Sequence, residues 1–156
     1  MPIDHSTLLF FDASALIAAA GSPRGGSGFL LELCQRGFLK AAVSHPVLVE
    51  AERNVREKLK NHTHALPNYF ELLIRTPFEI ASIPLRRDRA RYVRAAGEKD
   101  EHVLAAAVAS GAPFLVTLDQ PLETSVNAED FGLRALPPGA FIKNYLPLHP
   151  DFRRMR

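Results

Sequence analysis

The amino-acid sequence predicts an α/β fold, specifically a three-layer α/β/α sandwich with a central parallel sheet. Short apolar runs at residues 8–11 and 114–118 have the length and composition of buried strands. Longer segments of helical composition separate such runs, and this alternation is typical of βαβ units. The chain has 156 residues, of which 47% are hydrophobic, and this suits one domain with a sizeable core.

Turn-forming residues bound the apolar runs and set the limits of the expected strands. Gly37 precedes one run, Pro84 follows another, and the Gly-Ala-Pro sequence at 111–113 precedes a third. The connections between parallel strands are expected to be right-handed. The expected strands are residues 7–12, 38–43, 78–83, 114–118 and 131–136.

Capping and breaking residues set the expected helices in the same way. Ser44 is a candidate cap with Pro46 in the first turn behind it. Gly97 is expected to end a basic helix, and Asp100 is expected to start the next one. The expected helices are residues 15–20, 28–36, 45–59, 67–75, 85–96 and 100–110, with a short helix after residues 137–139.

Charge and cysteine content limit the class of protein. The formal net charge of +2 does not by itself indicate binding to nucleic acid. Cys34 is the single cysteine, so an internal disulfide is excluded and a reducing compartment is expected. The sequence has no apolar stretch of membrane-spanning length and no basic segment typical of a secretion signal. We therefore expect a cytoplasmic protein.

The last residues differ in composition from the rest of the chain. Residues 1–147 are expected to form a single domain, and residues 148–156 are expected to form a basic C-terminal tail. This tail contains Arg153, Arg154 and Arg156. Chain ends of this kind are often poorly ordered, so the tail is expected to be disordered.

Acidic residues follow two of the expected strands and lie near the starts of two helices. Asp12 and Asp119 end the first and fourth strands, and parallel strands bring their carboxyl ends to one edge of a sheet. Asp100 extends the apolar stripe of its helix, so its side chain is expected to face the sheet. Glu50 and Glu52 flank the inner face of their helix, and helical periodicity does not choose between them. Converging carboxylates would suit Mg²⁺ or Mn²⁺.

Each of these acids also has an explanation that involves no function. Asp12 is a suitable helix N-cap, and Asp100 also precedes a helix. Asp119 with Gln120 and Pro121 could simply start a turn. Glutamates such as Glu50 are usually solvated. Carboxylates that do converge repel one another and need a cation or raised pKa values, so a true cluster would imply the cofactor.

Four segments of the chain match known motifs in order and spacing. They are residues 9–17 (LFFDASALI), 50–55 (EAERNV), 100–107 (DEHVLAAA) and 115–119 (LVTLD). Through them the sequence resembles the PIN-domain ribonucleases, which include toxins of bacterial and archaeal toxin–antitoxin pairs. Residues 137–141 (PPGAF) also resemble the late Pro-x-x-Phe element of this family. The resemblance covers nearly the whole chain.

The resemblance implies a PIN-like fold and divalent-metal-dependent hydrolysis of RNA phosphodiester bonds. It implies an RNA substrate, Mg²⁺ or Mn²⁺ as the cofactor, a cognate antitoxin protein as a partner, and a homodimer. Ser14 and Thr117 would be supporting polar residues near the metal. Many relatives carry a further Asp soon after the fourth acid, where this chain has Glu123. The catalytic and metal-binding acids that the resemblance implies are Asp12, Glu50, Asp100 and Asp119.

Several alternatives remain open at this stage. Arg87, Arg91 and Arg94 share one face of a helix, and they either bind RNA phosphates or are solvated surface residues. A phosphatase of the haloacid dehalogenase type also has an Asp after its first strand, but it needs a second Asp where this chain has Ser14. A PIN-like module that binds RNA or protein without cleavage is the other alternative.

Overall fold

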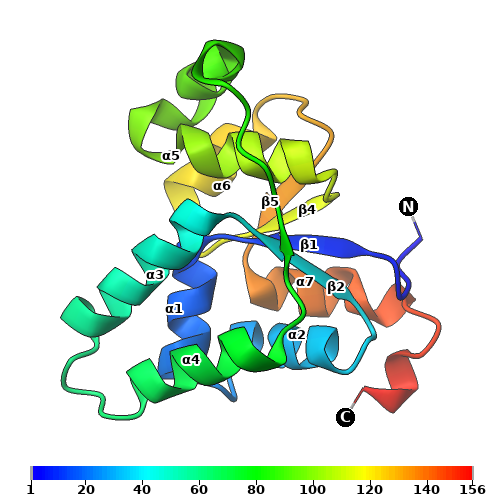
Figure 1. Cartoon of the computed structure of the whole chain (residues 1–156). Helices are drawn as coiled ribbons and strands as arrows, with labels where there is room; N and C mark the ends of the chain where they lie inside the picture. Colours follow the sequence, from blue (N-terminus) through cyan, green and yellow to red (C-terminus); the bar gives the residue numbers. More distant parts are fainter. Residues whose placement is uncertain (1, 156) are drawn as a thin grey trace.

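The computed structural model describes residues 2–155 of the chain, apart from the side chain of Arg86. Its centre is a five-stranded sheet in the order β3-β2-β1-β4-β5, in which every neighbouring pair is parallel (Figure 1). The strands are β1 (Leu8–Phe11), β2 (Lys40–Val43), β3 (Glu79–Ile80), β4 (Phe114–Val116) and β5 (Arg134–Leu136). The helices are α1 (Ala13–Gly21), α2 (Gly26–Gln35), α3 (His45–Lys58), α4 (Ala65–Arg75), α5 (Ala90–Ser110), α6 (Gln120–Asn127) and α7 (Pro138–Asn144).

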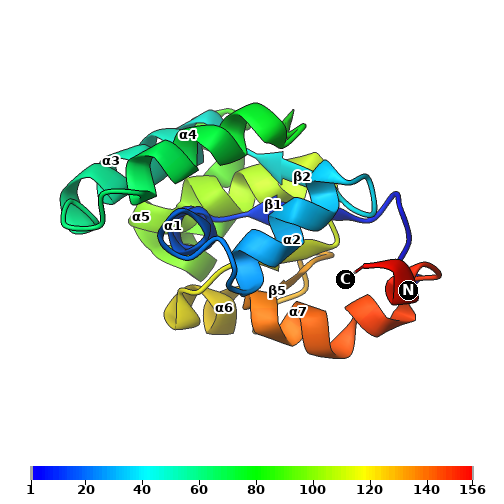
Figure 2. The ribbon, with the colours of Figure 1, turned by 90° about the horizontal axis from the view of Figure 1, so that it is seen from below.

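Helices cover both faces of the sheet, which confirms the predicted three-layer α/β/α sandwich. In the view of Figure 1, α1, α2, α4 and α7 lie below the sheet, and α5 and α6 lie above it. Helix α3 packs beside α1 and α4. Figure 2, seen from below, shows α2 in front of the strands and α1 end-on beside it. None of the helices within residues 2–155 is long and apolar enough to cross a membrane.

The strand order creates a switch point between β1 and β4. From β1 the chain moves outward to β2 and β3, and it then returns to the other side of β1 to form β4 and β5. Phe11 is in register with Val116, so β1 and β4 end side by side. In open parallel sheets, ligands bind beyond the carboxyl ends of the strands at such a point.

The two strands at the switch point are held in place by burial on both faces. Leu9, Phe10 and Phe11 of β1 are fully buried, as are Leu115 and Val116 of β4. Continuous apolar runs of this kind suit a parallel sheet between two helical layers. Burial of a large apolar side chain contributes about 1.5–3 kcal/mol, so the residues that directly follow these strands start from well-anchored positions.

The segment after β4 differs from the sequence-based prediction. Helix α6 is not predicted, and the interpretation of Asp119, Gln120 and Pro121 as a turn is wrong. Asp119 is the N-cap of α6, because its Oδ1 accepts a hydrogen bond of 3.1 Å from the Leu122 N–H. Pro121 lies in the first turn of the helix, where a missing N–H removes no helical hydrogen bond.

The lengths of two other elements also differ from the prediction. Strand β3 contains only Glu79–Ile80, and both residues are exposed because β3 lies at the edge of the sheet. Helix α5 spans the two helices predicted on either side of Gly97, and the predicted break at Gly97 is the kink between them. Gly97 has a φ of 81° and a ψ of 167°, and the positive φ is a conformation that favours glycine.

The C-terminal segment packs against the rest of the protein, so the expectation of disorder is wrong for residues 148–155. Two short 3₁₀ turns, Leu146–Leu148 and Phe152–Arg154, follow α7. His149 and Met155 are buried. Both chain termini lie at the same end of the molecule (Figures 1 and 2). Arg156, the last residue of the predicted basic tail, lies outside the described residues.

Candidate active site

Asp12 lies at the switch point of the sheet and is the most constrained acid there. Its backbone N–H donates to the carbonyl of Val116 at 3.0 Å, which continues the pairing of β1 with β4. Asp12 is also the N-cap of α1, with Oδ1 accepting from the Ala13 N–H at 2.7 Å. The capping role and the position at the end of a strand therefore belong to the same side chain.

Two hydroxyl groups hold the other oxygen of the Asp12 carboxylate. Thr117 Oγ1 donates to Asp12 Oδ2 at 2.8 Å, and Ser14 Oγ donates to the same oxygen at 3.1 Å. The two hydroxyl oxygens lie 3.3 Å apart. Ser14 Oγ also accepts from the Leu118 N–H at 2.9 Å, and Thr117 Oγ1 accepts from the Asp119 N–H at 3.0 Å. The hydroxyl pair thus joins the start of α1 to the end of β4.

The environment of Asp12 acts on its pKa in two directions. The residue is only 6% exposed, and burial raises the pKa of its carboxyl group. The carboxylate of Asp119 raises this pKa further, whereas the hydrogen bonds from Thr117, Ala13 and Ser14 lower it. These three donors therefore stabilise the charged form that burial disfavours, and they also fix the orientation of the carboxylate.

Asp100, on α5, is influenced by all three of the other predicted acids. Its side chain is half-buried, and burial is the main cause of the upward shift of its pKa. The carboxylates of Asp12, Asp119 and Glu50 each raise the pKa of Asp100 further, and Lys99 lowers it. The fold has therefore brought four acids that are distant in the sequence into one region of negative potential.

The structure separates Glu50 from Glu52, which the sequence pattern alone does not. Glu52 is half-buried, like Glu50, but its Oε2 accepts a hydrogen bond of 3.3 Å from Arg56 Nε in the same helix. Glu50 is half-buried, and its carboxylate acts on Asp100 of α5. Glu50 is therefore the acid on the site side of α3.

The four acids form a set of oxygen donors without ion-pair partners in the described part of the chain. In residues 2–155, the side chain of Arg86 excepted, no basic side-chain nitrogen lies within 4.0 Å of any of them, and no three have carboxylate oxygens within 4.8 Å of one another. Oxygen donors of this kind suit Mg²⁺ and Mn²⁺. A divalent cation would offset the repulsion that raises the pKa of Asp100, so the residues present fit such an ion.

Two backbone groups at the site have no signal in the sequence. The N–H groups of Ala13 and Leu118 contact Asp12 and Ser14, but nearly every residue carries such a donor. Their role becomes visible only when the fold is known.

Glu123, which stands where many relatives have a further Asp, lies in the first turn of α6.

The arginines before and within α5 do not form one free basic surface. Arg89 Nη1 lies 3.1 Å from Glu101 Oε1, and the two side chains are only 17% and 14% exposed. Arg91 stacks its guanidinium group over two aromatic rings. Arg87, Arg91 and Arg94 are exposed. The three arginines that share one face are therefore open to solvent, whereas the charge of Arg89 is offset by Glu101.

Comparisons with known proteins agree with this fold. A family model described as PIN domain matches residues 9–121, which is more than half of the chain. The crystal structure of PAE2754 from Pyrobaculum aerophilum is similar to this structure with a TM-score of 0.59 and 20% sequence identity, over 83% of this chain and 91% of that chain. At this identity the likeness shows the fold alone. No curated protein matches the chain significantly.

Proposed function

Because this chain belongs to the PIN-domain family, whose members are typically nucleases, we propose that it is a divalent-metal-dependent ribonuclease. Its reaction would be the hydrolysis of RNA phosphodiester bonds. The observation that carries this proposal is the position of Asp12 at the switch point of the sheet, where Thr117 and Ser14 hold its carboxylate. The upward shift of the pKa of Asp100, to which Asp12, Asp119 and Glu50 contribute, supports it. Carboxylates without ion-pair partners, gathered beyond the carboxyl ends of the central strands, support a cation site for phosphate chemistry.

Asp12 is the best-oriented candidate ligand for Mg²⁺ or Mn²⁺. Its Oδ2 already accepts two hydroxyl donors, whereas Oδ1 accepts one backbone N–H and keeps capacity for a cation. Ser14 and Thr117 would hold this carboxylate in place. Asp119 uses its Oδ1 to cap α6, which leaves Oδ2 for the ion.

The chemistry then divides between the ion and the side chains. A bound divalent ion polarises a phosphate oxygen and lowers the pKa of a water molecule. Glu50 and Asp100 are the candidates for the carboxylate that orients this water and accepts its proton. The reaction requires no covalent nucleophile from the chain.

Cleavage of structured RNAs in the presence of Mn²⁺ tests this proposal. We expect activity that EDTA abolishes and that Asp12→Asn reduces by at least about a hundredfold, because the best-fixed ligand loses its charge. Glu50→Gln should also be strongly impaired. Glu52→Gln is the matched control on the same helix and should cleave like the wild type. Cleavage that resists EDTA and survives Asp12→Asn would refute the mechanism.

The two alternative functions have less support. In a phosphatase of the haloacid dehalogenase type, the second residue after the first Asp is another Asp, but Ser14 stands there and donates to Asp12. A module that binds without cleavage requires no cation site. An Mn²⁺ site that disappears in Asp100→Asn would argue against such a module.

We also propose that this protein is the toxin of a toxin–antitoxin pair and acts in the cytoplasm. It would form a homodimer and bind a cognate antitoxin protein. Membership of the PIN-domain family supports this proposal. Three exposed apolar side chains on α3 and α4 are consistent with a protein partner: Val49, Phe70 and Ile74. Expression of the chain should inhibit growth, and a small DNA-binding protein encoded directly upstream should relieve the inhibition. Growth unaffected by expression of an active nuclease would contradict the toxin role.

A further inference from the structure

A second group of potential metal ligands lies near the amino ends of the strands, whereas the acidic site lies beyond their carboxyl ends. His5, His149 and Asp151 each offer one ligand atom, and these atoms lie within 4.8 Å of one another. In the described residues 2–155, this is the one group of three His, Cys, Asp or Glu side chains that meets this distance. His5 precedes β1, whereas Asp12 follows it, so the two sites are separated by the length of the strand.

Both imidazole rings are already anchored by one nitrogen each. His5 Nδ1 donates to the carbonyl of Gly37 at 2.9 Å, and His149 Nε2 donates to the carbonyl of Phe38 at 2.8 Å. A histidine that binds a metal almost always donates its other ring N–H to a carbonyl or carboxylate group. The carbonyls of Gly37 and Phe38 therefore accept the hydrogen bonds that would orient the two histidine ligands. The other ring nitrogens, His5 Nε2 and His149 Nδ1, would be the ligand atoms.

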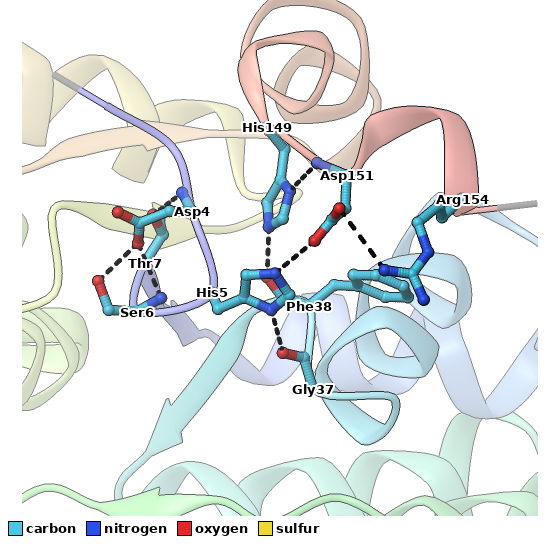
Figure 3. A network of polar contacts seen from close by, with 9 residues as sticks. All are labelled: Asp4, His5, Ser6, Thr7, Gly37, Phe38, His149, Asp151 and Arg154. Atoms are coloured by element: carbon cyan, nitrogen blue, oxygen red, sulfur yellow. Dashed lines mark hydrogen bonds and ion pairs between the residues drawn. The ribbon is translucent and has the colours of Figure 1, made fainter.

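Asp151 contacts both of these ring nitrogens (Figure 3). Its Oδ2 is 2.6 Å from His5 Nε2, and its backbone N–H donates to His149 Nδ1 at 3.0 Å. An ion would replace the proton shared by His5 and Asp151, and this proton would leave to solvent. The Asp151 N–H would have to move away from His149 Nδ1. Arg154 approaches only the other carboxylate oxygen, at 3.7 Å, and is exposed.

The burial of the three side chains suits entry of an ion from one side. His149 is 3% exposed, so its ring is held rigidly within the fold. The side chains of His5 and Asp151 are 52% and 27% exposed, which leaves a path from solvent and a position for a water ligand. Two imidazole nitrogens and one carboxylate suit Zn²⁺ and its neighbours among the transition metals, whereas Mg²⁺ prefers oxygen donors alone.

We propose that His5, His149 and Asp151 form a second metal site that binds a zinc-class ion such as Zn²⁺ or Co²⁺. The ion would join the segment before β1 to the C-terminal segment, and the carbonyls of Gly37 and Phe38 in the turn before β2 would hold the two histidine ligands. Its function would be to lock the two ends of the chain onto the sheet. The site shares no residue with the acidic cluster, so it does not depend on the nuclease proposal.

Metal titration of the full-length protein tests this site. Zn²⁺ binding would be followed by calorimetry and Co²⁺ binding by visible absorption, both with saturating Mg²⁺ present to occupy oxygen-donor sites. We expect one ion per chain, the intense absorption of tetrahedral Co²⁺, and a higher Tm with Zn²⁺. His5→Gln and Asp151→Asn should each weaken binding by about tenfold or more and remove the rise in Tm.

The control is a variant in which the exposed His62 and His64 are both changed to Gln, and it should bind like the wild type. His5 is exposed, so His5→Gln is expected to fold, and the Tm measured without metal verifies this. Absence of stoichiometric Co²⁺ or Zn²⁺ binding in the wild type would overturn the proposal. Binding that is equally strong in His5→Gln would overturn it as well.

Discussion

Replacing Thr117 with Val tests how the site is held together in the absence of any ion. Thr117 is fully buried, and its hydroxyl group both donates to Asp12 Oδ2 at 2.8 Å and accepts from the Asp119 N–H at 3.0 Å. Valine has almost the same shape but neither bonding capacity. The substitution therefore removes the direct link between the acid after β1 and the backbone before α6.

The two lost contacts set the size of the effect. A hydrogen bond to a charged group contributes about 1.5–3 kcal/mol, and an unsatisfied buried donor such as the Asp119 N–H costs about 1–3 kcal/mol. Burial of the additional methyl group of valine offsets about 0.8 kcal/mol of this loss. We expect Thr117→Val to lower the free energy of unfolding by about 2–5 kcal/mol. The pKa of Asp12 should also rise further, because Thr117 is the largest of the causes that lower it.

Urea unfolding followed by circular dichroism, with EDTA present, measures this loss. Thr117→Ser is the matched control, because it keeps the hydroxyl group and removes one buried methyl group, at a cost of about 1 kcal/mol. The reasoning fails if Thr117→Val is as stable as the wild type, or if the Ser variant loses as much stability as the Val variant.

Three further predictions concern other parts of the molecule. Asp100→Asn should raise the Tm in EDTA by about 2–4 °C at neutral pH, because the folded-state pKa of Asp100 is raised and its ionisation destabilises the fold. Below about pH 4 the carboxyl group is protonated in both the folded and the unfolded state, so the gain in Tm should vanish there. A gain that persists below this pH would contradict its electrostatic origin. Gly28→Ala should destabilise the fold by more than about 2 kcal/mol, since the added Cβ would lie 2.0 Å from the Pro23 carbonyl oxygen. Gly139→Ala is the control, because an added Cβ there would have no atom within 4 Å, and this variant should be neutral or stabilising in the same urea assay. Burial raises the pKa of Cys34 to about 12, so Ellman's reagent at pH 8 should label it only after unfolding, and rapid native labelling would contradict this burial.

The cost of Asp100 to stability indicates why the protein retains these acids. A group whose pKa is raised by burial and by like charges destabilises the folded state when it ionises. Removal of such a group commonly improves stability and impairs function. An increase in Tm together with a loss of Mn²⁺ binding in Asp100→Asn would therefore mark the cluster as a functional site.

Local sequence signals predicted the elements whose formation depends on neighbouring residues. The apolar run of β1 followed by Asp12, the Ser44 cap of α3 and the break at Gly97 all lie where the sequence places them. Helix α6 was not predicted because Pro121 is compatible with two local structures. Proline after Asp119 favours a turn, but it also suits the first turn of a helix, and only packing against α5 and β5 decides between them.

The sequence alone determined the α/β class, the parallel sheet and the position of Asp12 directly after β1, because the periodicity of burial and the capping chemistry act over a few residues. Strand β4 ends at Val116, earlier than the predicted Leu118, so Asp119 caps α6 and does not end the strand. Tertiary structure decided which glutamate of α3 lies near Asp100, since both flank the same helical face. It also decided that His5 meets Asp151, 146 residues away in the chain. Contacts at such separations depend on how strands and helices pack, and no local spacing encodes them.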